Sequence, residues 1–124
     1  MGIEKHKIAV ATTGSAGSAT GTAVLALPAS ELVAVFLDFN ASAPSTTDTT
    51  LKAIGGDLAD ITVLTVTNSA TDGWYFPGEQ MDDNAAAAIT GAYQHPLIHQ
   101  NLSIDLAQAD ALSPCLTAYV FVRV

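Results

Sequence analysis

The chain is poor in charge, and basic residues are scarcest of all. Only 13% of the 124 residues are charged, about half the share found in an average soluble protein. Four are Lys or Arg and twelve are Asp or Glu, which gives a net charge of −8. Nucleic-acid binding needs basic side chains clustered along one face, so the composition argues against a nucleic-acid partner. Ser, Thr and Ala take the place of the missing charges. Such a surface fits either a β protein with a Thr-rich solvent face or a protein covered in an assembly.

Cysteine and long apolar runs are also scarce. Cys115 is the single cysteine, so an intrachain disulfide is excluded, and we expect its thiol to be a small, buried, unreactive core group. No run approaches the ~20 apolar residues of a membrane span, and we expect no membrane partner. The stretch from Met1 to Lys7 is too polar for a signal peptide. We therefore expect a protein made in the cytoplasm.

Helical periodicity is nearly absent, and β-branched runs separated by turn signals replace it. Such spacing predicts an antiparallel, jelly-roll-like β-sandwich, a single all-β domain spanning residues 1–124. One helical turn is expected over Ala85–Ile89, capped by Asn84 and closed by Gly91. The predicted strands cover Lys7–Thr13, Thr22–Leu27, Glu31–Phe39, Thr49–Ile54, Ile61–Thr67, Leu102–Leu106 and Leu116–Val124.

Two of these strands carry a readable pattern. Both faces of Glu31–Phe39 are apolar, which predicts a central strand covered on two sides. The final strand turns one apolar set inward and places Tyr119 and Phe121 on the opposite face. The connector Ala107–Pro114 fits a hairpin loop between the last two strands.

The sequence offers little for catalysis or metal binding. His95 and His99 have the i, i+4 spacing of a zinc pair, but no third ligand lies nearby. Asp82, Asp83 and Asn84 form an acidic cluster without the spacing of a calcium loop. The carboxylate pairs Asp57/Asp60 and Glu79/Asp82 are most simply surface acids. We expect no enzyme activity, no metal and no cofactor.

The densest signal is the stretch Asn68–Gly78, which places Trp74, Tyr75 and Phe76 in succession. Asp72 and the glycine after it permit a tight turn, and the proline after Phe76 ends regular pairing. Adjacent residues in an extended segment point to opposite sides. We therefore expect one or two rings to anchor the loop and at least one to be covered by another subunit or a partner protein. Trp74 is the expected anchor and Tyr75 the expected docking ring.

Several segments together resemble the small β-sandwich cement, or decoration, proteins of tailed-bacteriophage heads. They are Gly14–Ala23, Leu32–Phe39, Ala43–Leu51, Thr67–Pro77 and the terminal Leu102–Val124. The resemblance implies a sandwich that acts through contacts rather than catalysis, on the outer surface of the virion head. It implies the major capsid protein and further copies of the chain as partners, as a homodimer or alternatively a trimer.

Seven residues are expected to contact a partner. They are Asp72, Trp74, Tyr75, Phe76, Pro44, Tyr119 and Phe121. A basic residue often follows the Tyr-x-Pro step in that family, whereas Gly78 stands there in this chain. Any salt bridge formed by that basic residue is therefore not expected here.

Two other functions fit parts of the sequence. A jelly-roll carbohydrate-binding module would use Trp74 and Tyr75 as a stacking platform, with Asp72 holding sugar hydroxyls. A small hydrolase with a sandwich fold is the second alternative, although the sequence contains no nucleophile motif that supports it.

Overall fold

The computed structural model describes residues 2–82 and 84–124, and strands account for most of them. No helix in this described part is long and apolar enough to cross a bilayer. The strands are β1 (Ile3–Val10), β2 (Ala19–Ala26), β3 (Ser30–Phe39), β4 (Asp48–Ile54), β5 (Ile61–Val66), β6 (Gly73–Tyr75), β7 (Glu79–Asp82), β8 (Ala88–Gln94), β9 (Leu97–Ile98), β10 (Asn101–Ala109) and β11 (Leu116–Arg123).

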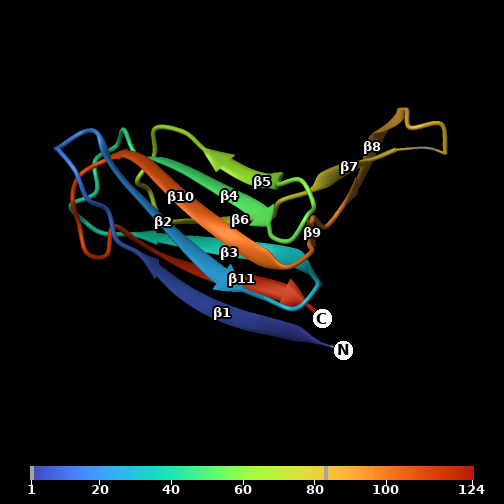
Figure 1. The fold of residues 1–124 in the computed structure, drawn as a ribbon. Helices are drawn as coiled ribbons and strands as arrows, with labels where there is room; N and C mark the ends of the chain where they lie inside the picture. Colours follow the sequence, from blue (N-terminus) through green and yellow to red (C-terminus); the bar gives the residue numbers. More distant parts are fainter. Residues whose placement is uncertain (1, 83) are drawn as a thin grey trace.

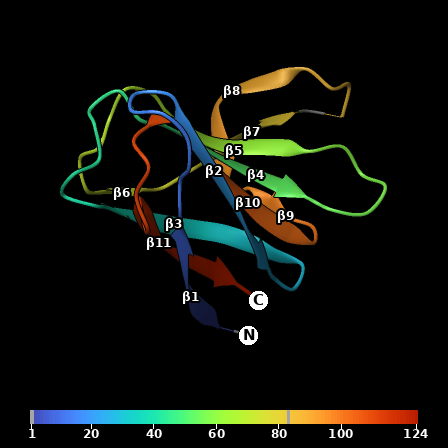
Figure 2. The ribbon, with the colours of Figure 1, turned by 60° about the vertical axis from the view of Figure 1, so that its left-hand side comes forward.

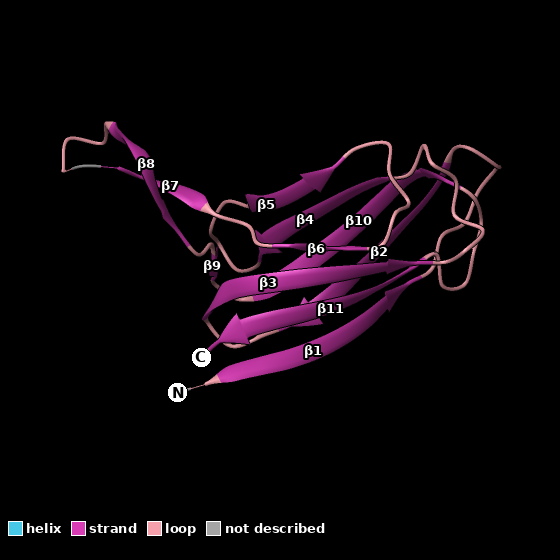
Figure 3. Cartoon of the chain, turned by 180° about the vertical axis from the view of Figure 1, so that it is seen from behind, coloured by secondary structure: helices cyan, strands magenta, loops and turns pink. Residues whose placement is uncertain are grey.

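Two sheets pack against each other to form a β-sandwich (Figures 1 and 3). The first has the order β1-β11-β3-β6, with β9 also pairing with β3; the second has the order β2-β10-β4-β5. All the strand pairings described are antiparallel. The predicted all-β antiparallel sandwich is therefore confirmed.

The core lies between the two sheets and follows the predicted alternation. On β10, Leu102, Ile104 and Leu106 face inward and are buried. On β11 every second residue from Leu116 to Val122 is buried as well. Each fully buried aliphatic side chain stabilises the fold by about 1.5–3 kcal/mol. These two strands lie on opposite sides of the core, so the last third of the chain contributes one long strand to each sheet.

A β-bulge explains why both faces of β3 read as apolar. Val122 on β11 pairs with Leu32, and the preceding residue pairs with Ala34, which leaves Val33 unpaired. The extra residue reverses the alternation, so Leu32 and, beyond the bulge, Val35 are both buried. The inner face of β3 meets the second sheet. On its outer face Phe36 contacts the rings of Trp74 and Tyr119, which belong to the same sheet, so no second layer is seen there and the prediction of two covered faces holds for one face among the described residues.

The expected hairpin between the last two strands is wrong. β10 belongs to the second sheet and β11 to the first, so the connector crosses from one layer to the other. Thr12 anchors it: its hydroxyl donates to the Asp110 carbonyl at 2.5 Å and accepts from the Leu112 amide at 3.1 Å. Alternation alone shows which residues face inward, but it does not show which sheet a strand joins.

The helical turn expected over Ala85–Ile89 is wrong as well. A turn leads there into β8, which pairs with β7 in a separate two-stranded sheet. We call this hairpin, Glu79–Gln94, the arm, because it projects away from the sandwich (Figures 1 and 2). A seven-residue helix would need tertiary packing to persist. Pairing with β7 instead satisfies the backbone, and Gly91 adopts a φ of 79° within the strand rather than capping a helix.

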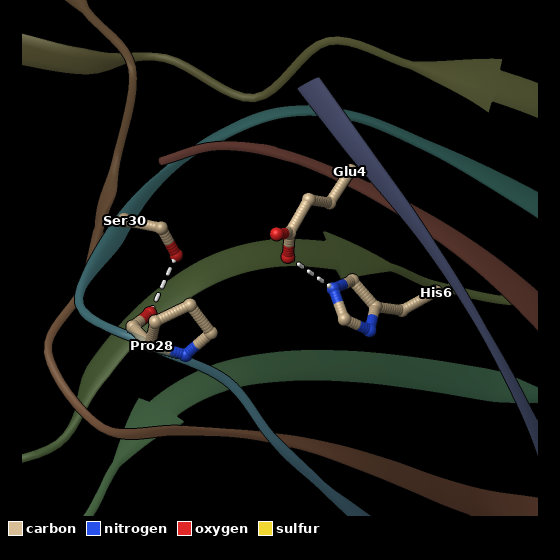
Figure 4. A network of polar contacts seen from close by, with 4 residues as sticks. All are labelled: Glu4, His6, Pro28 and Ser30. Atoms are coloured by element: carbon tan, nitrogen blue, oxygen red, sulfur yellow. Dashed lines mark hydrogen bonds and ion pairs between the residues drawn. The ribbon is translucent and has the colours of Figure 1, made fainter. Parts of the chain in front are cut away.

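The strands β1 and β2 approach closely at one end of the sandwich. A Cβ built on Gly21 would lie 2.0 Å from the carbonyl oxygen of Ala11. Toward the N-terminus of β1, the side chain of Glu4 contacts that of His6 at 3.1 Å (Figure 4). Nearby, at the start of β3, the Ser30 hydroxyl donates to the Pro28 carbonyl at 2.8 Å (Figure 4). The two sheets thus approach closely at the Gly21 end, and polar side chains lie between them near the N-terminus (Figure 4).

Candidate functional site

The outward face of the first sheet carries a ladder of aromatic side chains. In one row across the strands, Lys7 pairs with Tyr119, Tyr119 with Phe36, and Phe36 with Trp74. Directly opposed residues of an antiparallel sheet share a face. The burial pattern of β11 places Tyr119 and Phe121 opposite to its buried residues, as predicted. We call the five rings of Phe36, Trp74, Phe76, Tyr119 and Phe121 the outer patch.

The rings of the outer patch contact one another rather than standing apart. The Trp74 ring centroid lies 5.1 Å from that of Phe36 and 5.5 Å from that of Phe121. Phe76 stacks on Trp74 with centroids 6.3 Å apart, and Phe36 lies 6.4 Å from Tyr119. Such pairs contribute about 0.5–1.5 kcal/mol each beyond area burial. Even so, Trp74 stays 54% exposed and Phe76 74% exposed. The rings of the patch therefore contact one another, while two of them stay largely open to solvent.

Three of the four basic residues lie beside these rings. Lys5 pairs across strands with Phe121, and Lys7 with Tyr119. The Lys7 ammonium stands 5.7 Å from the centre of the Tyr119 ring, within the range of a cation–π contact. Arg123 follows two residues after Phe121 and so shares its face. A protein of net charge −8 thus places three of its four basic residues on one aromatic face.

The structure reverses the expected roles of Trp74 and Tyr75. Tyr75 is half-buried and packs against the hydrophobic core, whereas Trp74 and Phe76 point outward. The reason is that β6 pairs with β3 as an edge strand, so its alternate residues face the two sides of the sheet. Tyr75 is therefore the anchor of this segment, and Trp74 belongs to the exposed surface.

Asp72 and Pro44 have local structural contacts. A carboxylate oxygen of Asp72 accepts a hydrogen bond from the Phe39 amide at 2.7 Å, which fixes the start of β6 to the end of β3. Pro44 lies in the loop between β3 and β4, where its carbonyl accepts from the Thr47 amide at 3.1 Å and hydroxyl at 2.7 Å. The ring contacts of the outer patch do not include Pro44.

A pocket of about 340 Å³ opens where the outer patch meets the arm. We call it the edge pocket; its lining residues are Glu31, Phe76, Pro77, Gly78, Tyr93, Gln94 and His95. Its two aromatic rings are well exposed, Phe76 at 74% and Tyr93 at 63%. The Glu31 carboxylate lies 3.9 Å from the Arg123 guanidinium, and both side chains are partly exposed. Such a pair contributes little, so Glu31 remains free to meet another cation.

Residues considered for metal binding do not gather into a ligand set. Within residues 2–82 and 84–124, no three His, Cys, Asp or Glu side chains come together in a group able to hold a metal ion. His95 lines the edge pocket, while His99 follows β9. Asp83, part of the acidic cluster considered for calcium, lies outside the described residues. Cys115 is fully buried, as predicted, and burial raises the pKa of its thiol.

Sequence reasoning missed four residues of this surface. Phe36 was visible as part of the apolar outer face of its strand, but its contact with Trp74 depends on β6 joining that edge. Lys5 and Lys7 lie two residues apart on β1 and so share a face. The sequence alone does not show that this face adjoins the aromatic rings, because that depends on β1 pairing with β11. Tyr93 lies on β8, a strand outside those predicted from the sequence.

Comparisons with known proteins add no relative. No model of a protein family matches the chain, and neither the curated proteins nor the solved structures that were searched include a significant match.

Proposed function

We propose that this protein is a decoration protein of a tailed-bacteriophage head, which binds the outer surface of the shell and stabilises it through many repeated contacts. One observation carries the proposal: the molecule leaves apolar surface uncovered in two separate elements. The first is the outer patch. The second is the arm, on which Met81, Ile89 and Tyr93 are exposed. Exposed apolar patches of this kind mark interaction sites.

Two uncovered surfaces match the two contacts that a decoration protein makes. One contact is with the major capsid protein and the other is with further copies of the chain, as a homodimer or alternatively a trimer. Weak contacts repeated over a symmetric shell add up through avidity. The scarcity of charge supports the same proposal, because interface cores are depleted in charged residues. The proposal includes no catalytic step.

Head binding by the purified protein tests the proposal. The protein is mixed with phage heads that lack it, and binding is measured by co-sedimentation and by the temperature at which the heads release DNA. We expect saturable binding and a higher release temperature. Met81→Asp with Ile89→Asp should abolish binding if the arm meets the shell. Leu58→Asp is the matched control, because Leu58 is an exposed apolar residue between β4 and β5. No binding by the parent protein would rule the function out.

A carbohydrate-binding module is the second candidate, and the edge pocket favours it. Aromatic rings beside Glu31, Gln94 and His95 provide both stacking and hydrogen-bonding groups. The structure changes the predicted platform, since Tyr75 packs inward and Phe76 would accompany Trp74. A glycan array separates the candidates: sugar binding that Trp74→Ala abolishes would support this one, and an array without a hit would count against it.

A further inference from the structure

We propose that the outer patch is a two-fold homodimer interface in which Lys5 of one copy enters the edge pocket of the other, toward Glu31. Lys7 of each copy then lies over the partner's Trp74. The inference deepens the self-association included in the proposed function and rests on that part alone.

The layout of the face makes it complementary to itself. The strand order β1-β11-β3-β6 places Lys5 and Lys7 at one edge, with Trp74 and the edge pocket at the other. A two-fold axis parallel to the strands, lying between two facing sheets, brings the β1 edge of each copy over the β6 edge of its partner. Every contact is then made twice, as in an isologous interface.

The strand registers also bring Lys7 opposite the partner's Trp74 and Lys5 toward the partner's edge pocket. Such an axis leaves each residue at its own level along the strand direction. Lys7 and Trp74 occupy one row, and Lys5 occupies the row of Phe121, one step closer to the edge pocket. Facing sheets pack about 10 Å apart. The extended Lys side chains can therefore cross the gap, while Tyr119 of each copy meets Phe36 of the other near the axis.

The pocket has the chemistry that a lysine ammonium needs. Exposed rings of Phe76 and Tyr93 provide negative π faces, and the Glu31 carboxylate provides the counter-charge. Arg123 already stands 3.9 Å from Glu31, too far for a hydrogen bond. A second cation can thus approach Glu31 without first breaking a strong ion pair.

The area of the face is sufficient for a dimer of moderate strength. Three strands counted over eight residues and the edge segment 73–78, at ~4.8 Å between strands and ~3.3 Å per residue, give a face of ~480 Å² per copy, or ~950 Å² for the pair. Specific interfaces begin at about this size. The centre of the face is aromatic and its edges carry charge, which is the usual anatomy of an interface.

A charge swap tests the inference directly. In the Glu31→Lys variant, a cation at position 31 faces Lys5 of the partner at both contacts of the dimer. In the double variant Lys5→Glu with Lys7→Glu, a carboxylate at position 5 faces Glu31 of the partner, and the cation over Trp74 is lost as well. Each variant alone should dimerise at least about tenfold more weakly than the parent protein. Mixed in equal amounts, the two variants should form heterodimers, because every facing pair is then of opposite charge.

Sedimentation velocity and native mass spectrometry, with one variant isotopically labelled, give the readout. The melting temperature of each variant shows that it is folded. In the parent protein, carbodiimide cross-linking should join Lys5 to Glu31 between copies, which needs no variant. The inference is overturned if the parent is monomeric at high micromolar concentration, if either variant dimerises as well as the parent, or if the folded variants fail to associate when mixed. Head binding is measured separately and decides only the proposed function.

Discussion

Tyr75 and Trp74 are neighbours in the sequence with opposite environments. Tyr75 packs on the core, and Trp74 lies in the exposed outer patch. We expect Tyr75→Ala to lower the free energy of unfolding by about 2–3 kcal/mol, below the value for a fully buried ring because Tyr75 is half-buried. Trp74→Ala should cost about 1.5 kcal/mol, the low end for its three ring pairs because the indole is largely exposed, and should weaken self-association. Urea unfolding of both variants measures which substitution lowers the free energy of unfolding more. A larger decrease for Trp74→Ala than for Tyr75→Ala would contradict the assignment.

Cys115 predicts a specific pH dependence. Burial raises the pKa of its thiol, a Thr12 hydrogen bond opposes the rise, and the Asp110 carboxylate adds to it. The folded protein therefore holds the thiol proton more tightly than the unfolded chain does. This contribution to stability is complete below the unfolded thiol's pKa of about 8.5 and is lost as the pH rises through the higher folded pKa.

The measurement compares unfolding free energies of the parent protein and Cys115→Ala between about pH 7 and pH 10, the range in which an unfolded thiol titrates. The parent should lose stability more steeply in the alkaline limb. Taking the difference between the two curves removes every contribution that both proteins share. Parallel curves would show that the thiol proton does not stabilise the fold.

Among the elements, the long central strands could be predicted and the short edge strands could not. Leu102–Leu106 and Leu116–Val124 alternate over enough residues to define their inner faces, and the structure confirms both. Which sheet each strand joins is decided by packing across the core, so the expected hairpin between them was wrong. β6 has three residues and takes its conformation from pairing with β3.

The candidate site was predicted in part for the same reason. The aromatic segment and the outward Tyr119 and Phe121 are visible from local pattern. The patch itself depends on strands far apart in sequence, since β1, β3, β6 and β11 must become neighbours. The direction of each ring in β6 also depends on that pairing, which is why Trp74 and Tyr75 were interchanged.

The close approach of β1 and β2 predicts a sharp effect at Gly21. A methyl group there would stand 2.0 Å from the Ala11 carbonyl oxygen, so the backbone of one strand must move. We expect Gly21→Ala to destabilise the fold by about 1–3 kcal/mol. Gly73→Ala is the matched control, because its new Cβ would meet only the Tyr75 ring at 3.9 Å. Equal melting temperatures for the two variants would contradict the tight junction.

For the whole molecule, we expect stability to be independent of metal ions. The core is formed by two apolar sheet faces, and the described residues contain no metal-ligating group of three or more side chains. A chelator should therefore leave the melting temperature unchanged, and elemental analysis should find no stoichiometric metal. A drop of several degrees on chelation would show that a metal stabilises the fold.

The position of Trp74 has an optical consequence for the whole molecule. It is the protein's only tryptophan, and it lies in the outer patch rather than in the core. Intrinsic fluorescence excited at the indole band therefore reports the environment of the docking surface. In a free monomer the emission should be red-shifted and readily quenched by acrylamide, and covering the patch should shift it to the blue. The chain thus contains its own spectroscopic probe of assembly, readable during titration without an added label.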